Sequence, residues 1–368
     1  MKKLLIAISA IVVLVSMPFL LPTKTKSFSE KLLKEAMYYE KWDNKIVHCL
    51  LCPRKCVIPD KQRGFCGVRE NRNGILYTLV YAEPVTINID PIEKKPLFHV
   101  LPGSYAFSVA TVGCNLKCKF CQNWQISQAR PGEVKSMHVS PAELVEKVKR
   151  SGAPVIAFTY TEPTIFFEYM LETAKLAHKA GLRNVMHSAG FINPEPLKEI
   201  CKYLDAANID LKGFTQKYYE EICLGSLDNV LESLKIIKQA GVHLEITCLI
   251  LPGLNDDPDT IRAMCVWIRK NLGSDVPVHF SRFWPMYKLV NLSPTPIETL
   301  EKARRIAMDT GLKYVYIGNA PGNPAENTYC PVCHRPVILR SGYTIIGRHI
   351  DKKGRCEYDG TNIEGIWN

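Results

Sequence analysis

The middle of the chain alternates short β-branched runs with amphipathic stretches, and this alternation constrains the fold more than any other feature. The runs expected to form strands are residues 106–112, 155–160, 184–188, 206–210, 244–250, 276–280 and 313–317. Alternation of strands with helical stretches is typical of βα units that build a parallel sheet. Seven strands in this order predict an α/β fold, a partial (β/α) TIM-like barrel with further regions at both ends.

Two helix starts are marked clearly. Ser140 and Thr295 are each followed by a proline and, three residues on, by a glutamate. A hydroxyl at the N-cap, proline at the first helical position and a reciprocal glutamate form a capping box. We therefore expect one helix to begin after Ser140 and another after Thr295.

Polar and glycine residues follow the predicted strands at their carboxyl ends. These segments are residues 113–114, 161–163, 188–190, 210–212, 252–253, 281–282 and 318–319. Barrels of this kind carry their chemistry on the rim where the strands end. The sequence therefore predicts an active-site face along this rim.

Fourteen cysteines in 368 residues fall into three clusters and four single positions. Such grouping in a long chain favours metal ligation over a disulfide scaffold. The single residues lie in periodic apolar stretches and are expected to pack in the core; they are Cys201, Cys223, Cys248 and Cys265. The chemistry must therefore be sought in the three clusters.

The cluster that follows the first predicted strand comprises Cys114, Cys118 and Cys121. Three thiolates this close in sequence are able to hold three corners of one cubane iron–sulfur cluster and to leave the fourth iron open. A structural zinc site would be closed by four ligands, and no fourth Cys or His follows locally. A zinc loop or a set of buried thiols is the alternative interpretation.

This C-x3-C-x2-C loop, with Phe120 before its third cysteine, resembles the radical S-adenosylmethionine (SAM) superfamily. The segments from Asp90 to His99 and from Cys118 to Trp124 resemble pyruvate formate-lyase activating enzymes and, more closely, the radical SAM enzyme of the AmmeMemoRadiSam system. The resemblance extends from about Lys34 to Trp367.

The resemblance implies a [4Fe-4S] cluster on the three cysteines, whose free iron is chelated by SAM. The cofactor-binding residues that it implies are Phe120, Glu162, Asp210 and Lys212. Reductive cleavage of SAM would give a 5′-deoxyadenosyl radical that abstracts hydrogen from an unidentified substrate, and the activating enzymes suggest a protein glycine. The enzyme would then be an oxidoreductase, with flavodoxin or ferredoxin as its reductant.

The chain departs from the family at two places. Tyr160 and Thr161 replace both glycines of the Gly-Gly-Glu-Pro segment that receives the SAM amino group, and Tyr287 stands near the place of an activase histidine. These replacements put the backbone and ribose contacts to SAM in question, whereas the cysteine loop is complete.

Several polar residues on the rim also have a structural interpretation. Asp210 and Lys212 are two residues apart on one strand face, where they would neutralise each other. His187 and His279 stand beside apolar strand residues, as core histidines do. Arg282 fits a substrate-anion anchor as well as a structural ion pair.

Two further cysteine clusters flank the barrel. Four thiols near the amino terminus suit a closed zinc site, which leads narrowly, or an auxiliary iron–sulfur cluster; they are Cys49, Cys52, Cys56 and Cys66. Near the carboxyl terminus, Cys330, Cys333 and Cys356 resemble two zinc-ribbon knuckles, with Asp359 where relatives carry a fourth cysteine. Zinc at this incomplete site stays an open prediction.

An uncharged apolar run begins at Leu4 and ends at Leu21, which is long enough as a helix to cross a hydrocarbon core. No A-x-A-like cleavage site precedes Lys24, so a retained membrane anchor is favoured over a cleaved signal, and a start at Met17 would remove most of the run. Cluster loading requires a reducing compartment, which places the catalytic body in the cytoplasm.

The net charge of +11 is uneven, because residues 1–75 hold 14 Lys and Arg against 6 Asp and Glu. A basic front on a nearly neutral body argues against a broad nucleic-acid surface and for local contact with lipid headgroups or another anion. A solvated basic face explains the same charge.

We therefore predict four regions: a hydrophobic anchor or signal (1–25), a Cys-rich region (26–104), a radical SAM core barrel (105–320) and a zinc-ribbon-like region (321–368). Two classes of function compete, namely a radical SAM enzyme and a non-catalytic, metal-stabilised binding module that is tethered at a membrane or contacts RNA. The open three-cysteine loop and the strand-end residues favour the enzyme, since a scaffold has no need of an open iron.

Overall fold

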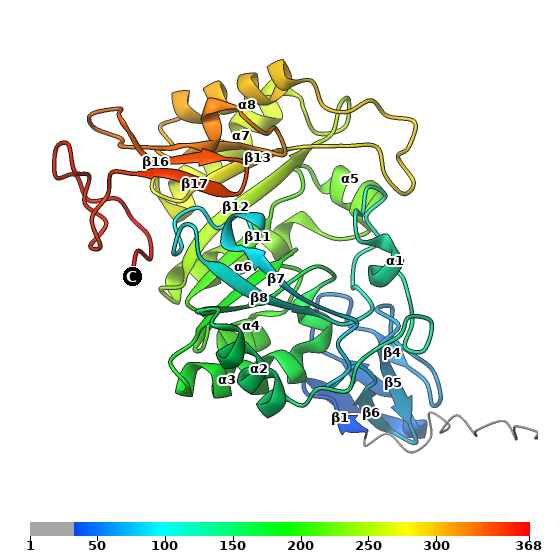
Figure 1. Cartoon of the computed structure of the whole chain (residues 1–368). Helices are drawn as coiled ribbons and strands as arrows, with labels where there is room; N and C mark the ends of the chain where they lie inside the picture. The colour runs from blue at the N-terminus through cyan, green and yellow to red at the C-terminus, as the bar shows by residue number, and fades with distance from the viewer. Residues whose placement is uncertain (1–32) are drawn as a thin grey trace, which may run out of the picture. The chain divides into compact units, whose positions relative to one another are not determined.

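An eight-stranded sheet forms the centre of the molecule in the computed structural model, which describes residues 33–368 (Figure 1). Its strands lie in the order β14-β13-β12-β11-β10-β9-β8-β7 and are parallel except for β7, which runs antiparallel to β8 at one edge. The strands are β7 (Thr86–Pro91), β8 (Tyr105–Ala110), β9 (Val155–Phe158), β10 (Arg183–Ser188), β11 (Ala206–Asp210), β12 (His243–Ile250), β13 (Val278–Arg282) and β14 (Val315–Gly318). The predicted partial (β/α) barrel is confirmed.

Six helices alternate with these strands and lie on the outer side of the curved sheet (Figure 1). They are α2 (Pro141–Ser151), α3 (Phe167–Lys179), α4 (Pro194–Cys201), α6 (Leu227–Gln239), α7 (Pro258–Leu272) and α8 (Ile297–Asp309). Two short helices, α1 (Trp124–Ser127) and α5 (Gln216–Tyr218), follow strands on the active-site side of the barrel. This order is the βα alternation that the sequence predicts.

The two predicted capping boxes have different outcomes. Ser140 caps α2 as expected, since its hydroxyl accepts from Glu143 N and the Glu143 carboxylate accepts from Ser140 N at 2.8 Å. The second capping box is wrong, because α8 begins without a side-chain cap. Thr295 is buried and its hydroxyl donates to Ile250 O at 2.5 Å, so it is not available to the helix.

Small antiparallel sheets and single turns of helix make up the ends of the described chain. The amino-terminal strands are β1 (Lys34–Glu35), β2 (Tyr39–Lys41), β3 (Val47–Cys49), β4 (Val57–Ile58), β5 (Arg69–Arg72) and β6 (Ile75–Thr78), and the carboxyl-terminal strands are β15 (Thr328–Tyr329), β16 (Pro336–Ser341) and β17 (Thr344–Arg348). Single helical turns at the ends cover Asp43–Lys45 and Pro324–Glu326, whereas three others lie between strands of the central sheet, at Ile92–Lys94, Pro163–Phe166 and Tyr219–Cys223. These ends supply the cysteines that flank the barrel.

A buried arginine fastens the carboxyl-terminal sheet to the barrel. Arg340, on β16, donates from Nη2 to Phe98 O at 2.8 Å and from Nη1 to Thr328 Oγ1 at 2.9 Å. The last residues add a second attachment, because Ile366 N donates to His99 O at 2.7 Å. The carboxyl-terminal region therefore packs as part of the barrel assembly.

No helix within residues 33–368 is long and apolar enough to cross a membrane. The predicted anchor from Leu4 to Leu21 lies outside the described residues, so it stays a prediction.

Candidate active site

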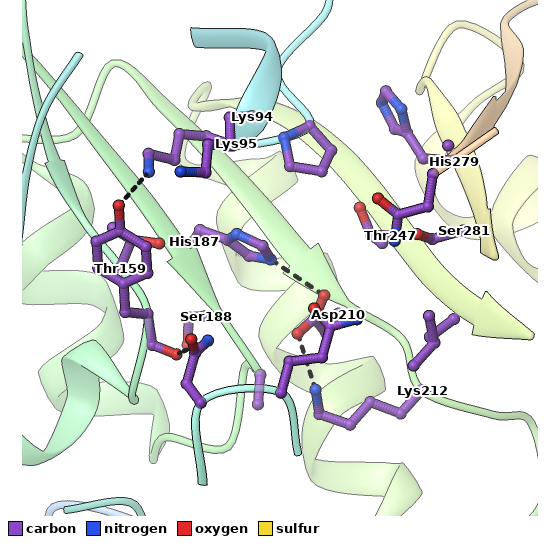
Figure 2. Close-up of a pocket in the computed structure, with 18 of the residues that line it drawn as sticks. Lys94, Lys95, Thr159, His187, Ser188, Asp210, Lys212, Thr247, His279 and Ser281 are labelled. Carbon is purple, nitrogen blue, oxygen red and sulfur yellow. Dashed lines mark hydrogen bonds and ion pairs between the residues drawn. The ribbon is translucent and has the colours of Figure 1, made fainter. Parts of the chain in front are cut away.

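A cavity of about 350 Å³ opens at the carboxyl ends of the parallel strands. It is lined by all three cysteines of the predicted loop and by all four predicted cofactor residues: Cys114, Cys118, Cys121, Phe120, Glu162, Asp210 and Lys212. The strand ends contribute further polar side chains, among them Ser188, Thr247 and Ser281 (Figure 2). The structure therefore brings the sequence-predicted site residues together in one place.

The cysteine loop is held by backbone contacts to a distant segment. Lys117 N donates to Cys223 O at 3.0 Å and Lys119 N donates to Ile222 O at 2.9 Å. On the other side of the loop, Asn115 Nδ2 donates to Phe191 O at 2.7 Å. These contacts hold the loop between strand ends, and its three thiols line the cavity.

Gly113 allows the amino-terminal region to pack directly against this loop. Its φ is +96°, and a Cβ there would lie 2.6 Å from Val68 Cγ1 and 3.0 Å from Cys66 O. No other residue fits both this backbone conformation and this close approach. The amino-terminal cysteines are thus brought next to the active-site loop, where Arg54 Nε also donates to Asn115 O at 3.0 Å.

The three thiols have different surroundings. Burial raises the pKa of Cys114 well above its usual value, and burial also raises the pKa of Cys121, whose Sγ lies 3.2 Å from Ser127 Oγ. A hydrogen bond from the Cys223 thiol lowers the pKa of Cys118. Buried thiols of this kind ionise fully once they ligate a metal, because the cation replaces the lost solvation.

Cys223 is one residue whose position the sequence did not reveal. It is fully buried, as predicted for a core cysteine, but it also lies against Cys118. Nothing in its apolar surroundings in the sequence distinguishes it from Cys248 or Cys265. Only the fold brings the Tyr219–Cys223 turn to the cysteine loop.

Glu162 is a fully buried carboxylate with strong local support. Its Oε1 accepts from Thr164 N at 3.0 Å and from Ser188 Oγ at 2.7 Å, and its Oε2 accepts from Ala189 N at 2.9 Å. Among the described residues Oε2 has this single partner, so it retains the capacity to accept from a bound ammonium group. The side chain is held rigidly and faces the cavity.

Tyr160 stands at a position where the family has glycine, and it keeps the backbone conformation that glycine favours. Its φ is +68°, in the left-handed region, which costs a non-glycine residue of the order of 1 kcal/mol. The hydroxyl donates to Asp90, and Lys95 Nζ lies 4.4 Å from the ring centroid. Glycine would adopt this backbone conformation before Glu162 without strain.

Asp210 lies between two basic groups. Lys212 Nζ approaches Asp210 Oδ2 at 2.8 Å, and His187 Nε2 lies 3.1 Å from Oδ1 (Figure 2). Burial would raise the pKa of Asp210, but Lys212 and His187 outweigh it and hold this pKa well below its usual range. The three side chains form a hydrogen-bonded row at the cavity, and Lys212 is also 5.8 Å from the Phe120 ring centroid.

The structure agrees with both interpretations of Asp210 and Lys212, as a neutralising ion pair and as residues at the cofactor cavity. Asp210 and Lys212 do neutralise each other, as the alternative interpretation expects, yet both line the cavity. Both histidines line the cavity: His187 is half-buried and bonded to Asp210, whereas His279 is buried, with its Nε2 2.7 Å from Glu245. The outcome differs between two histidines that look alike in sequence.

Arg282 fits neither of its sequence-based interpretations. Its Nε donates to Thr295 O at 2.8 Å and its guanidinium lies 4.6 Å from the Trp284 ring centroid. Tyr287, in turn, stacks on Trp124 with ring centroids 5.4 Å apart. Neither residue is among those that line the cavity.

The far side of the cavity carries residues that the sequence analysis left without a role. Lys94 and Lys95 both bind Asp90, at 2.8 and 2.7 Å, and line the cavity opposite Lys212 (Figure 2). They lie in the Asp90 to His99 segment that carries the family resemblance, which is the signal that could have identified them.

The flanking cysteines differ from the loop and from each other. Burial raises the pKa of Cys52 to about 12 and that of Cys66 to about 11, and the nearby Cys49 thiol adds to both shifts. Within residues 33–368, a single group of three or more metal-ligating side chains has all its ligand atoms within 4.8 Å of one another. This group comprises Cys330, Cys333, Cys356 and Asp359. The amino-terminal set is therefore more widely spaced than the carboxyl-terminal set.

Comparison with known proteins assigns the chain to a family. The profile of the radical SAM superfamily matches residues 108–264, which include the cysteine loop, Glu162 and Asp210. The chain belongs to the radical SAM superfamily. An uncharacterised protein of Methanocaldococcus jannaschii is 46% identical over 334 residues, which cover 90% of this chain and 99% of that protein.

Two further proteins that the chain resembles are pyruvate formate-lyase activating enzymes. A pyruvate formate-lyase-activating enzyme of Clostridium pasteurianum is 25% identical over 55% of this chain and 87% of its own length. A solved domain of the activating enzyme from Bacteroides vulgatus superposes with a TM-score of 0.39 at 18% identity, over 44% of this chain and 98% of that one. The structural likeness is too low to carry a functional argument for this radical SAM protein.

The residues present fit the cofactors that radical SAM enzymes use. Three soft thiols converge on one cavity, and no disulfide occupies them in the described chain. They do not gather within 4.8 Å as the ligands of a single ion do, which suits a cubane in which each thiolate binds a different iron. The cavity volume lies within the range of small-molecule sites.

Proposed function

We propose that this chain cleaves SAM reductively and uses the resulting 5′-deoxyadenosyl radical to abstract hydrogen from a substrate, as an oxidoreductase of the activating-enzyme type. The observation that carries the proposal is the single cavity shared by the three loop thiols and by Glu162, Asp210 and Lys212. A reduced [4Fe-4S] cluster with bound SAM supplies the electron and the radical chemistry.

The residues of the protein would position the cluster and SAM and exclude water from the site. Cys114, Cys118 and Cys121 would hold the cluster, and the free acceptor capacity of Glu162 suits the SAM ammonium group. Asp210 and Lys212 offer one acceptor and one cation to the remaining polar groups of SAM. Buried apolar walls such as Phe120 keep water from the site, which protects a reactive intermediate.

A protein glycine is the proposed class of hydrogen donor, and the names of the activating-enzyme relatives support it. Lys94, whose side chain is 44% exposed and pairs with Asp90, lines the cavity and is accessible from outside. A flavodoxin or ferredoxin is the proposed reductant, since the cluster needs single electrons of low potential. The non-catalytic alternative leaves the convergence of thiols and charged strand-end residues without a purpose.

Other predictions extend this proposal without being needed for it. The amino-terminal cysteines are proposed to bind zinc or an auxiliary cluster, and the region before residue 33 is proposed to contact a membrane while the body is cytoplasmic. The closer relationship to the AmmeMemoRadiSam enzyme also stays a proposal. Each concerns a part of the molecule outside the SAM cavity.

The test is anaerobic reconstitution of the full chain with iron and sulfide, followed by reduction in the presence of SAM. We expect 5′-deoxyadenosine and methionine in equal amounts, measured by chromatography and mass spectrometry. Cys121→Ala should give neither product, whereas Cys201→Ala, a matched change in the core, should retain activity. Absence of 5′-deoxyadenosine from wild-type protein with a filled cluster would contradict the proposal.

A further inference from the structure

The carboxyl-terminal region contains a turn shaped as a metal knuckle. Cys330 N donates to Arg335 O at 2.9 Å, and His334 N donates to Cys330 O at 3.0 Å. His334 closes the turn with a φ of +58°. This path turns the side chains of Cys330 and Cys333 to the same side of the chain.

A second turn repeats this design 26 residues further along the chain. Cys356 N donates to Thr361 O at 2.9 Å, and Gly360 N donates to Cys356 O at 2.9 Å. Gly360, which follows Asp359, has a φ of +77°. His334, which follows Cys333 in the first turn, has a φ of +58°, in the same left-handed region. In this repeat Asp359 occupies the position that Cys333 has in the first turn, so the geometry places its carboxylate as the fourth donor.

The four donor atoms have the spacing of a tetrahedral site. Cys333 Sγ lies 3.8 Å from Cys356 Sγ, and Cys330 Sγ lies 3.4 and 3.6 Å from the two Asp359 oxygens. Tetrahedral zinc with Zn–S bonds of about 2.3 Å and a Zn–O bond of about 2.1 Å separates two sulfurs by about 3.8 Å and sulfur from oxygen by about 3.6 Å. All four atoms lie within 4.8 Å of one another.

We propose that Cys330, Cys333, Cys356 and Asp359 bind one Zn²⁺ ion as a closed structural site. Three thiolates and a carboxylate complete four-coordination and leave no position for a substrate, as in structural zinc centres. Soft sulfur donors in a tetrahedron select zinc over calcium or magnesium, which prefer oxygen ligands in larger numbers. Asp359 therefore replaces the fourth thiolate rather than abolishing the site.

The site's place in the fold indicates what the metal stabilises. It joins the turn before β16 to the segment after β17, so it closes the three-stranded sheet at one end. The β16–β17 turn at the other end of that sheet supplies Gly342 and Tyr343 to the active-site cavity. The zinc ion thus supports a wall of the cavity through the sheet, in addition to the buried Arg340 contacts.

The experiment measures metal content in the full-length, cluster-loaded chain by mass spectrometry, for wild type and single variants. Cys333→Ser should contain one zinc fewer per chain than wild type, with its iron content unchanged. Cys265→Ser, a buried cysteine distant from any cluster in sequence, should match wild type in both metals. This difference also separates the site from zinc held by the amino-terminal cysteines.

Asp359 is exposed, so its variants test the ligand without disturbing the core. Asp359→Asn should lose zinc to a chelator at least about tenfold faster than wild type. Tenfold is the lower end of the loss in metal affinity that follows when a residue that only supports a ligand is replaced. Asp359→Cys should hold zinc at least as well as wild type. Equal zinc content in wild type and Cys333→Ser, loss of iron in place of zinc, or an unchanged rate in Asp359→Asn would each overturn the proposal.

Discussion

Two regions of this protein each contain three cysteines, and the structure gives them different forms. Cys114, Cys118 and Cys121 face a cavity of about 350 Å³ that Glu162 and Lys212 also line. The carboxyl-terminal thiols instead converge with a carboxylate, within 4.8 Å of one another. The number of thiols is equal, but one set is open and widely spaced whereas the other is closed and compact.

The difference teaches that ligand spacing and the fourth neighbour decide what a cysteine set can do. A single ion draws all its donors to one point, whereas each corner of a cubane has its own ligand. An open corner beside a charged cavity allows chemistry, and a carboxylate in the fourth position prevents it. Within the described residues, the amino-terminal cysteines have the wider spacing of the first kind.

The largest expected effect comes from making the same substitution in both regions. Cys118→Ala should abolish 5′-deoxyadenosine formation and reduce the iron content of reconstituted protein, because one corner of the cluster loses its thiolate. Cys333→Ala should leave the iron in place and lower activity less than tenfold, since it affects only the sheet behind the cavity. Product assays and metal analysis on both variants measure this, and equal activity losses would remove the distinction between the regions.

Glu162→Ala sharpens the comparison by removing the carboxylate that makes the first region a binding site. A hydrogen bond to a charged group contributes about 1.5–3 kcal/mol, so we expect SAM affinity to fall about 10- to 150-fold. Equilibrium binding of SAM to cluster-loaded protein measures the change. Ser188→Ala removes one donor to the same carboxylate and should have a smaller effect; a greater loss in this control would assign the role to Ser188.

The fold could be predicted from sequence to a large extent because its signal is local. The seven parallel strands appear within two residues of their predicted ends, since β-branched runs bounded by glycine turns leave few alternatives. Strand β7 was missed because its half-exposed, proline-ended sequence lacks that pattern. The second capping box failed for a tertiary reason, the burial of Thr295, which no local pattern records.

The site was predictable where chemistry depends on consecutive residues and not where it depends on packing. The cysteine loop and the strand-end positions of Glu162 and Asp210 follow from sequence, because parallel strands end on one rim. The contact of Cys223 with Cys118 and the assembly of Asp359 with three distant thiols arise only when separate segments meet. Long-range closure of this kind has no signature within a single window of sequence.

Tyr160 provides a test of whether backbone shape or side chain matters before Glu162. Tyr160→Gly should keep SAM affinity within about threefold, because glycine adopts the observed φ of +68° without strain. Tyr160→Val should lower the free energy of unfolding by about 1–2 kcal/mol and weaken SAM binding, since a β-branched residue resists this conformation. Urea unfolding and SAM binding measure both, and similar behaviour of the two variants would show that the side chain decides.

The smallest effect concerns the charge of Asp210, which is held by two basic side chains, His187 and Lys212. Burial would raise its pKa, but Lys212 and His187 hold it below the usual value. A carboxyl with a lower pKa in the folded state contributes stability above its unfolded pKa of about 3.9, and this contribution is lost as the pH falls through that range and below. Asp210→Asn should therefore cost about 1 kcal/mol at pH 7 and progressively less below pH 4. Urea unfolding of cluster-free protein across this range measures the cost, with the exposed Asp228→Asn as a control that should show no such trend. A cost for Asp210→Asn that stays constant down to pH 3 would mean that the carboxylate stabilises the fold through its shape rather than its charge.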